Sequence, residues 1–437
     1  MRKRILVLVI IFLSLSIQST FAEISFKPGA EVRIRHEFWK NIFDMSNSTK
    51  DNRNYFRIKY SVFGDLIFNE NVNLFTKLTD EFKSYTYFYQ ASNRKKGTTF
   101  SINETVFDNL YLNIKNVLGA PVDLRLGRQN LFGYGEGFLI MDGTPLDGSR
   151  TFYFNAAKAS WHLNDQQSLD FLYINNPRDD NFLPIINESS PTQSLNITNE
   201  EAYVLYFKDK SQEDLYWEGY YISKKESGTE GARLQSQQSR IYTPGVFVKY
   251  NLDPFVIRTQ GAYQFGNYGD SDRSAWGGYA FLDRSFKDKK WSPFLSGGFI
   301  YLSGNKADTD DNEGWDPLFS RWPWMSELYS LSYNGESGLD YWTNLQMWRA
   351  EFSVKPTEKL KLSAFYNFLR ANELPAGTSF ALGGGKNRGH LPQFKASYAI
   401  SKNVTTYFLA EYFIPGNFHS DEADDALFLR TEIKIKF

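Results

Sequence analysis

The last eleven residues of the chain, Leu427 to Phe437, read LFLRTEIKIKF and alternate between two kinds of side chain. One parity is apolar apart from a threonine, and the other is almost wholly charged: Leu427, Leu429, Thr431, Ile433, Ile435 and Phe437 against Phe428, Arg430, Glu432, Lys434 and Lys436. Successive side chains of a strand point to opposite faces, so this segment presents one face suited to lipid and one suited to water. A row of four charges does not fit the core of a soluble protein. The pattern predicts the closing strand of a transmembrane β-barrel.

The same two-residue period recurs along the whole chain. Four further segments alternate clearly, namely 30–39, 55–63, 255–265 and 360–368. Thirteen less regular segments have a similar length: 72–82, 106–115, 121–129, 151–162, 167–175, 201–208, 215–224, 241–251, 275–285, 291–302, 342–354, 391–400 and 404–413. About ten residues are what a tilted strand needs to cross a bilayer. The predicted fold is therefore all-β, a transmembrane antiparallel barrel of about eighteen strands, within a range of sixteen to eighteen.

The connections alternate between short and long. Short turns are expected at 164–165, 251–253 and 355–357, and long loops at 41–53, 84–103, 176–200, 225–239, 303–340, 370–390 and 414–425. Short periplasmic turns and long extracellular loops are typical of outer-membrane barrels. The predicted location is therefore the outer membrane.

The N-terminus predicts export. Three basic residues precede an apolar stretch from Ile5 to Ile17, and Thr20-Phe21-Ala22 places small residues at the first and third positions of a cleavage site. This is the pattern of a secretory signal peptide, and the apolar stretch is too short to span a bilayer as a helix. We expect residues 1–22 to be the signal peptide and residues 23–437 to form a single barrel domain.

Composition narrows the classes of protein further. The chain has 27 Tyr, 38 Phe and 10 Trp but no Cys, which suits aromatic girdles and removes disulfides, thiol catalysis and zinc–thiolate sites. A net charge of −1 argues against a nucleic-acid partner. The acidic stretch Asp308 to Gly314 has Glu313 where a calcium loop needs glycine, so a solvated loop is favoured. The sequence predicts no cofactor, no metal site and no enzymatic activity.

A glycine-rich block lies between two of the predicted strands. It consists of LRLGRQ at 124–129, YGEGF at 134–138 and DGTPLDGSRT at 142–151. Glycines permit tight turns and close approach of the backbone. A charged segment of this kind, fixed to the wall at both ends, could fold inward and narrow a pore.

This block resembles the alginate export family of outer-membrane porins. The C-terminal part is similar too: Gly389-His390 opens a strand, Ala410 to Phe413 precede a loop, and residues 424–437 close the barrel. The stretches 303–305 and 315–319 fit the family's long extracellular loop. The resemblance implies a monomeric barrel of about eighteen strands with a lumen lined by Arg and Lys. Its implied function is the outward diffusion of an anionic polysaccharide, an alginate-like polyuronate.

Candidate pore-lining or cargo-binding residues follow from the lumen parity and from the family-like block. Side-chain charges select the sign of an ion in a pore, and guanidinium groups pair bidentately with carboxylates. The candidates are Arg33, Arg35, Arg57, Lys59, Arg125, Arg128, Asp142, Asp147, Arg150, Arg258, Arg430 and Lys434. Arg128 has lumen parity only if Gly127 forms a bulge. Each arginine could instead pair with acidic residues of the same face, and the two aspartates are also good turn formers.

Two other functions remain open. The acidic residues on the lumen parity are compatible with a general or sugar-uptake porin, and the long loops are compatible with a surface binding or adhesion barrel. The predicted partners are an anionic poly- or oligosaccharide, outer-membrane lipid and periplasmic polysaccharide-export proteins.

Overall fold

The computed structural model describes residues 24–41, 45–48, 52–88, 105–141, 154–186, 198–227, 238–320, 324–328, 342–374 and 383–437. The predicted signal peptide lies outside these residues. One short 3-10 turn, η1 (Val117–Gly119), lies between two of the strands. Within the described residues, no helix is long and apolar enough to cross a membrane.

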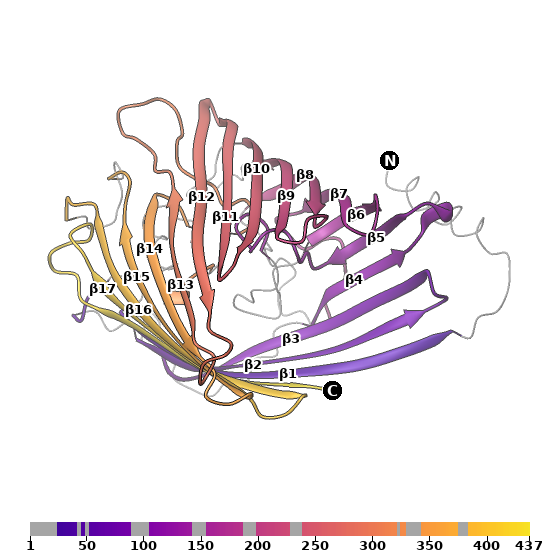
Figure 1. Ribbon diagram of the computed structural model, residues 1–437, viewed down its shortest axis with the longest axis horizontal. Coiled ribbons are helices and arrows are strands. Elements are labelled where there is room, and N and C mark those ends of the chain that lie inside the picture. Colours follow the sequence, from indigo (N-terminus) through magenta and orange to yellow (C-terminus); the bar gives the residue numbers. More distant parts are fainter. Residues whose placement is uncertain are drawn as a thin grey trace.

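Eighteen antiparallel strands form one closed barrel, because each strand pairs with the next and the last strand pairs with the first. Figure 1 shows the strands following one another around the wall, with the C-terminus beside β1. The strands are β1 (Ser25–Lys40), β2 (Arg53–Ile67), β3 (Val72–Phe88), β4 (Val106–Ile114), β5 (Val122–Gln129), β6 (Phe154–His162), β7 (Gln167–Asn176), β8 (Asn199–Asp209), β9 (Leu215–Ser227), β10 (Ser239–Leu252), β11 (Phe255–Tyr268), β12 (Ser271–Ser285), β13 (Phe294–Leu302), β14 (Leu345–Val354), β15 (Leu360–Arg370), β16 (Asn387–Ala399), β17 (Val404–Pro415) and β18 (Ala426–Lys436).

Each of the eighteen predicted segments overlaps one of these strands. The alternation in sequence also separates the two faces of the wall. In β18, Arg430 and Glu432 are buried inside the barrel, whereas Thr431 between them is exposed on the outside. Large apolar side chains are exposed on the outer face of other strands, for example Trp276 and Phe352. Closure leaves no unpaired strand edge, which a lipid environment requires.

The two ends of the barrel differ as the sequence predicts. The turns at one end are short, for example 68–71, 163–166, 253–254 and 400–403. The connections at the other end are mostly long, and the exception is the two-residue turn at 269–270 between β11 and β12. This difference identifies the short-turn end as periplasmic and the long-loop end as extracellular.

Candidate functional site: a narrowed lumen

Residues 130–141, which follow β5, leave the wall and run along the inside of the barrel. The Tyr134 hydroxyl donates a hydrogen bond to Asp170 of β7 at 2.8 Å. The main-chain N–H of Gly135 donates to Glu218 of β9 at 2.6 Å. Gly135 has a φ of 56°, and a Cβ there would lie 2.6 Å from a side-chain oxygen of β11. Glycine therefore allows this segment to lie directly against the inner wall.

Glu136 fastens the same segment to β11 and β12. Its carboxylate pairs with the Arg258 guanidinium and accepts a hydrogen bond from the Tyr279 hydroxyl at 3.2 Å. Arg258 also pairs with Asp283 of β12. The inward fold expected of the glycine-rich block is therefore present over 130–141. Arg258, which we predicted as a cargo contact, serves here to hold that segment.

A second inward segment comes from the long connection between β13 and β14. The Trp315 indole packs onto the lumen face of β12, where a Cβ added to Gly277 would lie 2.6 Å from it. The carbonyl of Leu318 accepts a hydrogen bond from the Lys224 ammonium of β9 at 2.8 Å. As expected, this connection joins its two strands at the extracellular end, but these residues fold back into the barrel. Their indole and main-chain contacts are with the interior of the barrel.

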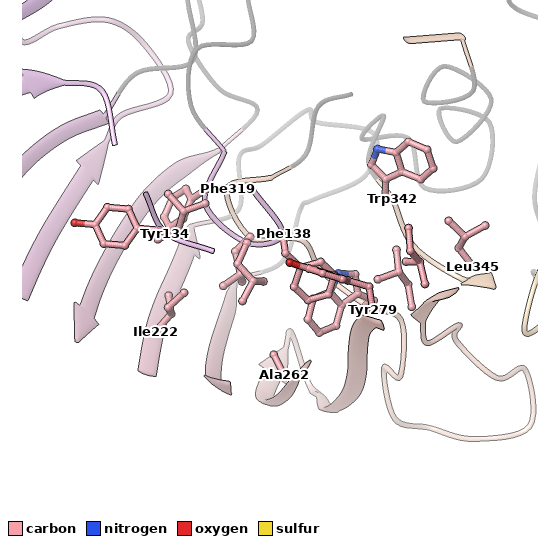
Figure 2. Close-up of a cluster of buried hydrophobic side chains, with 14 of the residues drawn as sticks. Tyr134, Phe138, Ile222, Ala262, Tyr279, Phe319, Trp342 and Leu345 are labelled. Carbon is pink, nitrogen blue, oxygen red and sulfur yellow. The ribbon is translucent and has the colours of Figure 1, made fainter. Parts of the chain in front are cut away.

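The two inward segments pair with each other. The main-chain N–H of Phe319 donates to the carbonyl of Leu139 at 2.9 Å, and the Phe138 ring stacks on Trp315 with centroids 5.1 Å apart. Figure 2 shows Phe138 on the side of Tyr279 of the wall and Phe319 nearer to Tyr134. These rings are almost completely buried. The paired segments therefore form a packed layer inside the barrel.

The second segment continues to the other side of the lumen. Ser326 and the main-chain N–H of Leu328 donate to the Glu411 carboxylate of β17, at 2.5 and 2.9 Å. Glu327 pairs with Arg430 of β18. The inward segments thus connect β7–β12 with β17–β18, and they narrow the lumen between these walls.

Five of the predicted pore-lining cations belong to a network at the seam where β18 meets β1. Glu37 has no exposed surface and pairs with Arg430 at 2.7 Å. Glu81 of β3 pairs with Arg57 at 2.7 Å and also with Arg33. We call this network the seam ladder; its other pairs are Arg35–Glu432 at 2.5 Å and Lys434–Glu31 at 3.0 Å. These cations face inward, but carboxylates of the wall already neutralise them.

The remaining described candidates have different surroundings. Lys59 is only 6% exposed, and within the described chain it forms no ion pair. Arg125 faces the lumen, donates to Asn113 at 2.7 Å and lies 4.7 Å above the Tyr111 ring. Its partners are uncharged, so its positive charge is not cancelled by direct contact.

Arg128 does not serve the lumen in the way that we expected. It forms a two-pronged ion pair with Asp180, at 2.6 and 3.1 Å, and its side chain is almost completely buried. Gly127 has a φ of 123°, but the pairing of β4 with β5 shows no register shift there. Arg128 therefore ties β5 to the segment after β7. The other three candidates, Asp142, Asp147 and Arg150, lie outside the described residues.

Two groups of cations that remain partly exposed line the periplasmic half of the lumen. The first, the β5–β8 patch, consists of Arg125, Lys158 and Lys208. Both lysine ammonium groups approach Asp170, at 3.5 and 3.6 Å, so that two cations share one carboxylate. Glu218 also lies opposite Lys208, but three hydrogen bonds from Gly135, Tyr206 and Tyr216 already engage its oxygens.

The second group, the β14–β16 patch, consists of Arg349, Lys361 and Lys395. Arg349 donates to two neutral amides, and Lys395 lies 4.8 Å above the Tyr407 ring. Lys361 approaches Glu351 at 3.8 Å, the only carboxylate in direct reach of the patch among the described residues. A pocket of about 320 Å³ opens beside Lys361 and Lys395, with two more lysines at its rim. Because β6 and β15 are nine strands apart in an eighteen-stranded barrel, the two patches lie on opposite walls.

Sequence reasoning did not select five of these six patch residues. Lys361 occupies the polar parity of a clearly alternating segment, and that signal would have found it. Lys158 lies among small residues in β6, where the alternation is weak. Both lysines are at least partly exposed to the lumen, whereas the arginines of the seam ladder are buried. This difference arises only in the closed barrel, so the sequence does not show it.

The closed barrel, its apolar outer face and its polar, narrowed interior define a channel of the outer membrane. The chain belongs to the alginate export family, whose model matches residues 25–430. No curated protein matches the chain significantly.

Solved structures from Pseudomonas aeruginosa share the fold. OccK8 (OprE) and OpdQ each superpose with a TM-score of 0.59 at 10% identity, and they cover 96% and 94% of this chain and 99% of their own. OpdK, solved with vanillate, gives a TM-score of 0.56 at 7% identity over 94% of this chain and 98% of its own. At this identity the likeness shows the barrel architecture.

Proposed function

We propose that the protein is a diffusion channel for the export of an anionic, carboxylate-bearing polysaccharide of the alginate type. The observation that carries the proposal is the pair of partly exposed basic patches on opposite walls of the periplasmic half. The family match supports the same class of cargo.

The chemistry of the patches suits transient contact with a polyuronate. Their cations are held by neutral amides, by aromatic rings or by a shared carboxylate. Exposed ion pairs are worth only about 0.2–1 kcal/mol each, so a passing carboxylate is attracted but released. A charged polymer can then exchange between the two walls without a tightly bound resting state.

The seam ladder has a different part in this proposal. Its arginines are buried and paired, so their role is to stabilise the barrel wall rather than to contact the cargo. The inward segments set the width of the path. They hold their position through the ion pair of Glu136 with β11 and through the hydrogen bonds of Ser326 and Leu328 to Glu411 of β17.

Uptake of small anionic solutes is the second candidate. The narrowing by two paired inward segments favours it, since a small solute needs less width than a polymer. The structural neighbour OpdK was solved with vanillate, which bears one carboxylate. Both candidates need an anion-selective lumen, and they differ in the size of what passes.

Single-channel recordings in planar bilayers test the proposal. We expect anion preference in a salt gradient and interruption of the current by oligouronates, with no interruption by neutral dextran oligomers of equal length. If oligouronates longer than a few sugars do not interrupt the current, the result would favour uptake of small solutes. Cation preference without any block would overturn both candidates, and a barrel without conductance would support the adhesion alternative.

A further inference from the structure

We infer that the outer face of β9, β10 and β11 carries a binding site for the phosphorylated headgroup of a glycolipid in the outer leaflet. A cavity of about 380 Å³ opens there at the long-loop end of the barrel. Its described lining includes Lys225, Arg240, Asn267 and Asp270. This site is separate from the lumen and does not depend on the proposed cargo.

The cations of this cavity point away from the lumen. Lys224 and Glu226 are buried on the inside of β9, so Lys225 between them faces outward. In the same way, Arg240 lies between two buried residues of β10 and is exposed. The register places Lys225 directly opposite Arg240. Within the described chain, neither side chain forms an ion pair. Both cations can therefore contact an anion that lies between them.

Asn267 adds a directed donor to the two cations. It lies opposite Arg240 on the neighbouring strand, and its side-chain carbonyl accepts the main-chain N–H of Arg240 at 3.1 Å. That bond fixes the amide so that its NH₂ group remains available to the cavity. An ammonium, a guanidinium and an amide then surround one point, which suits the several oxygens of a phosphate monoester. Asp270 at the rim is the one carboxylate among the described lining residues.

The height of the cavity in the membrane identifies the source of the phosphate. A row of outward-facing aromatic side chains, Tyr221, Tyr242 and Phe265, crosses the same three strands. Tyr242 is two residues from Arg240, which in a strand is about 7 Å along the wall. Aromatic side chains of barrels mark the interface between the hydrocarbon and the headgroups. Lys225 and Arg240 therefore lie at the headgroup level of the outer leaflet, where lipid phosphates are concentrated.

Native mass spectrometry of the detergent-solubilised protein, titrated with bisphosphorylated lipid A, tests this site. We expect the wild type to bind, and we expect K225Q/R240Q to bind about tenfold more weakly, because two charge-assisted contacts are lost. The matched control is K355Q/K359Q, which removes two lysines at the periplasmic end and should bind as the wild type does. Both variants alter surface residues, and a heat-dependent shift in electrophoretic mobility confirms that each barrel is folded.

Two further probes separate the sources of phosphate. Dephosphorylated lipid A should bind the wild type about tenfold more weakly, and inorganic phosphate should not displace the lipid. The inference is overturned if K225Q/R240Q binds bisphosphorylated lipid A as tightly as the wild type, or if K355Q/K359Q weakens binding equally. Displacement by inorganic phosphate at equal concentration would assign the cavity to a free anion instead.

Discussion

Glu37 shows how the surroundings of a charged residue decide its role. It is 0% exposed, accepts a hydrogen bond from the Tyr55 hydroxyl at 2.7 Å and pairs with Arg430 at 2.7 Å. Arg57 lies 3.6 Å away as well. A carboxylate in this position neutralises cations that could not otherwise be buried. The arginines around it are thus structural, although sequence alone made them good candidates for cargo contact.

The variant E37Q keeps the shape of the side chain and removes its charge. We expect it to lower the free energy of unfolding by about 3–5 kcal/mol, because Arg430 and Arg57 lose their shared counter-charge inside the wall. Urea unfolding in detergent micelles, followed by electrophoretic mobility, measures this. The control K436Q removes a lysine that is 63% exposed and 4.0 Å from Glu31, and it should change stability by less than about 1 kcal/mol. Equal midpoints for E37Q and the wild type would contradict the role assigned to Glu37.

Single residues also show where sequence reasoning reaches its limit. The parity of Arg33 and Arg430 within their own strands was readable, because it is a local two-residue period. The partner of Arg430 was not readable, since Glu37 lies 393 residues away and meets it only when the barrel closes. Arg128 and Asp180 are 52 residues apart, and a local two-residue period does not reveal their pairing either. Neutralisation of a lumen charge is therefore a property of the register, which the sequence does not display.

At the scale of elements, strands were predictable and inward segments only partly so. The glycine-rich block indicated that residues after β5 could leave the wall, and 130–141 do so. Nothing local distinguished 315–320 and 324–328 from an ordinary extracellular loop. Their position follows from contacts with β9, β12 and β17, which are distant in sequence.

The first inward segment should loosen when its ion pair with β11 is removed. The variant E136A loses the contacts with Arg258 and Tyr279, and hydrogen bonds to charged groups are worth about 1.5–3 kcal/mol each. We expect a larger mean single-channel conductance and more current noise. The control E313A removes a carboxylate from the loop after β13. The described contacts of Glu313 are with residues of that loop, so the conductance should stay that of the wild type. Unchanged conductance in E136A would show that Glu136 does not hold the narrowing.

The loop between β17 and β18 should respond to pH through His419. Its imidazole is 2% exposed and packs between Phe413 and Phe418, and burial together with the nearby Arg388 lowers its pKa to about 3. An opened loop restores the ordinary pKa of about 6.5. The closed loop is therefore favoured above pH 6.5, and it loses stability as the pH falls towards 3, because only the open form binds a proton.

At pH 5 this difference amounts to about 2 kcal/mol, since one pKa unit corresponds to about 1.4 kcal/mol. We expect faster amide hydrogen exchange in residues 416–425 at pH 5 than at pH 7.5, after correction for the intrinsic exchange rate. The variant H419Q has no titrating group at this position and should lose the pH dependence. Equal pH dependence in H419Q and the wild type would exclude His419 as the origin.

At the scale of the whole molecule, the lumen contains two kinds of cation. Some are buried and paired with carboxylates of the wall, and others remain accessible to a passing ion. The seam ladder and the two basic patches face the same space, but the arginines of the ladder are buried, whereas the cations of both patches are partly exposed. Ion selectivity depends on charges that a passing ion can approach. The two sets should therefore respond differently to neutralisation, even though each contains Arg or Lys on the lumen parity.

Neutralising the patches should reduce anion selectivity. We expect K158Q/K208Q/K361Q/K395Q to move the reversal potential in a salt gradient towards that of an unselective pore and to shorten oligouronate block, since two lysines on each wall no longer attract the carboxylates of the cargo. The comparison variant R33Q/R57Q removes two cations of the seam ladder. It should unfold at lower urea concentration because the buried Glu81 loses its ion pairs with Arg33 and Arg57. If R33Q/R57Q shifted selectivity and the lysine variant did not, the cargo path would run along the seam rather than between the patches.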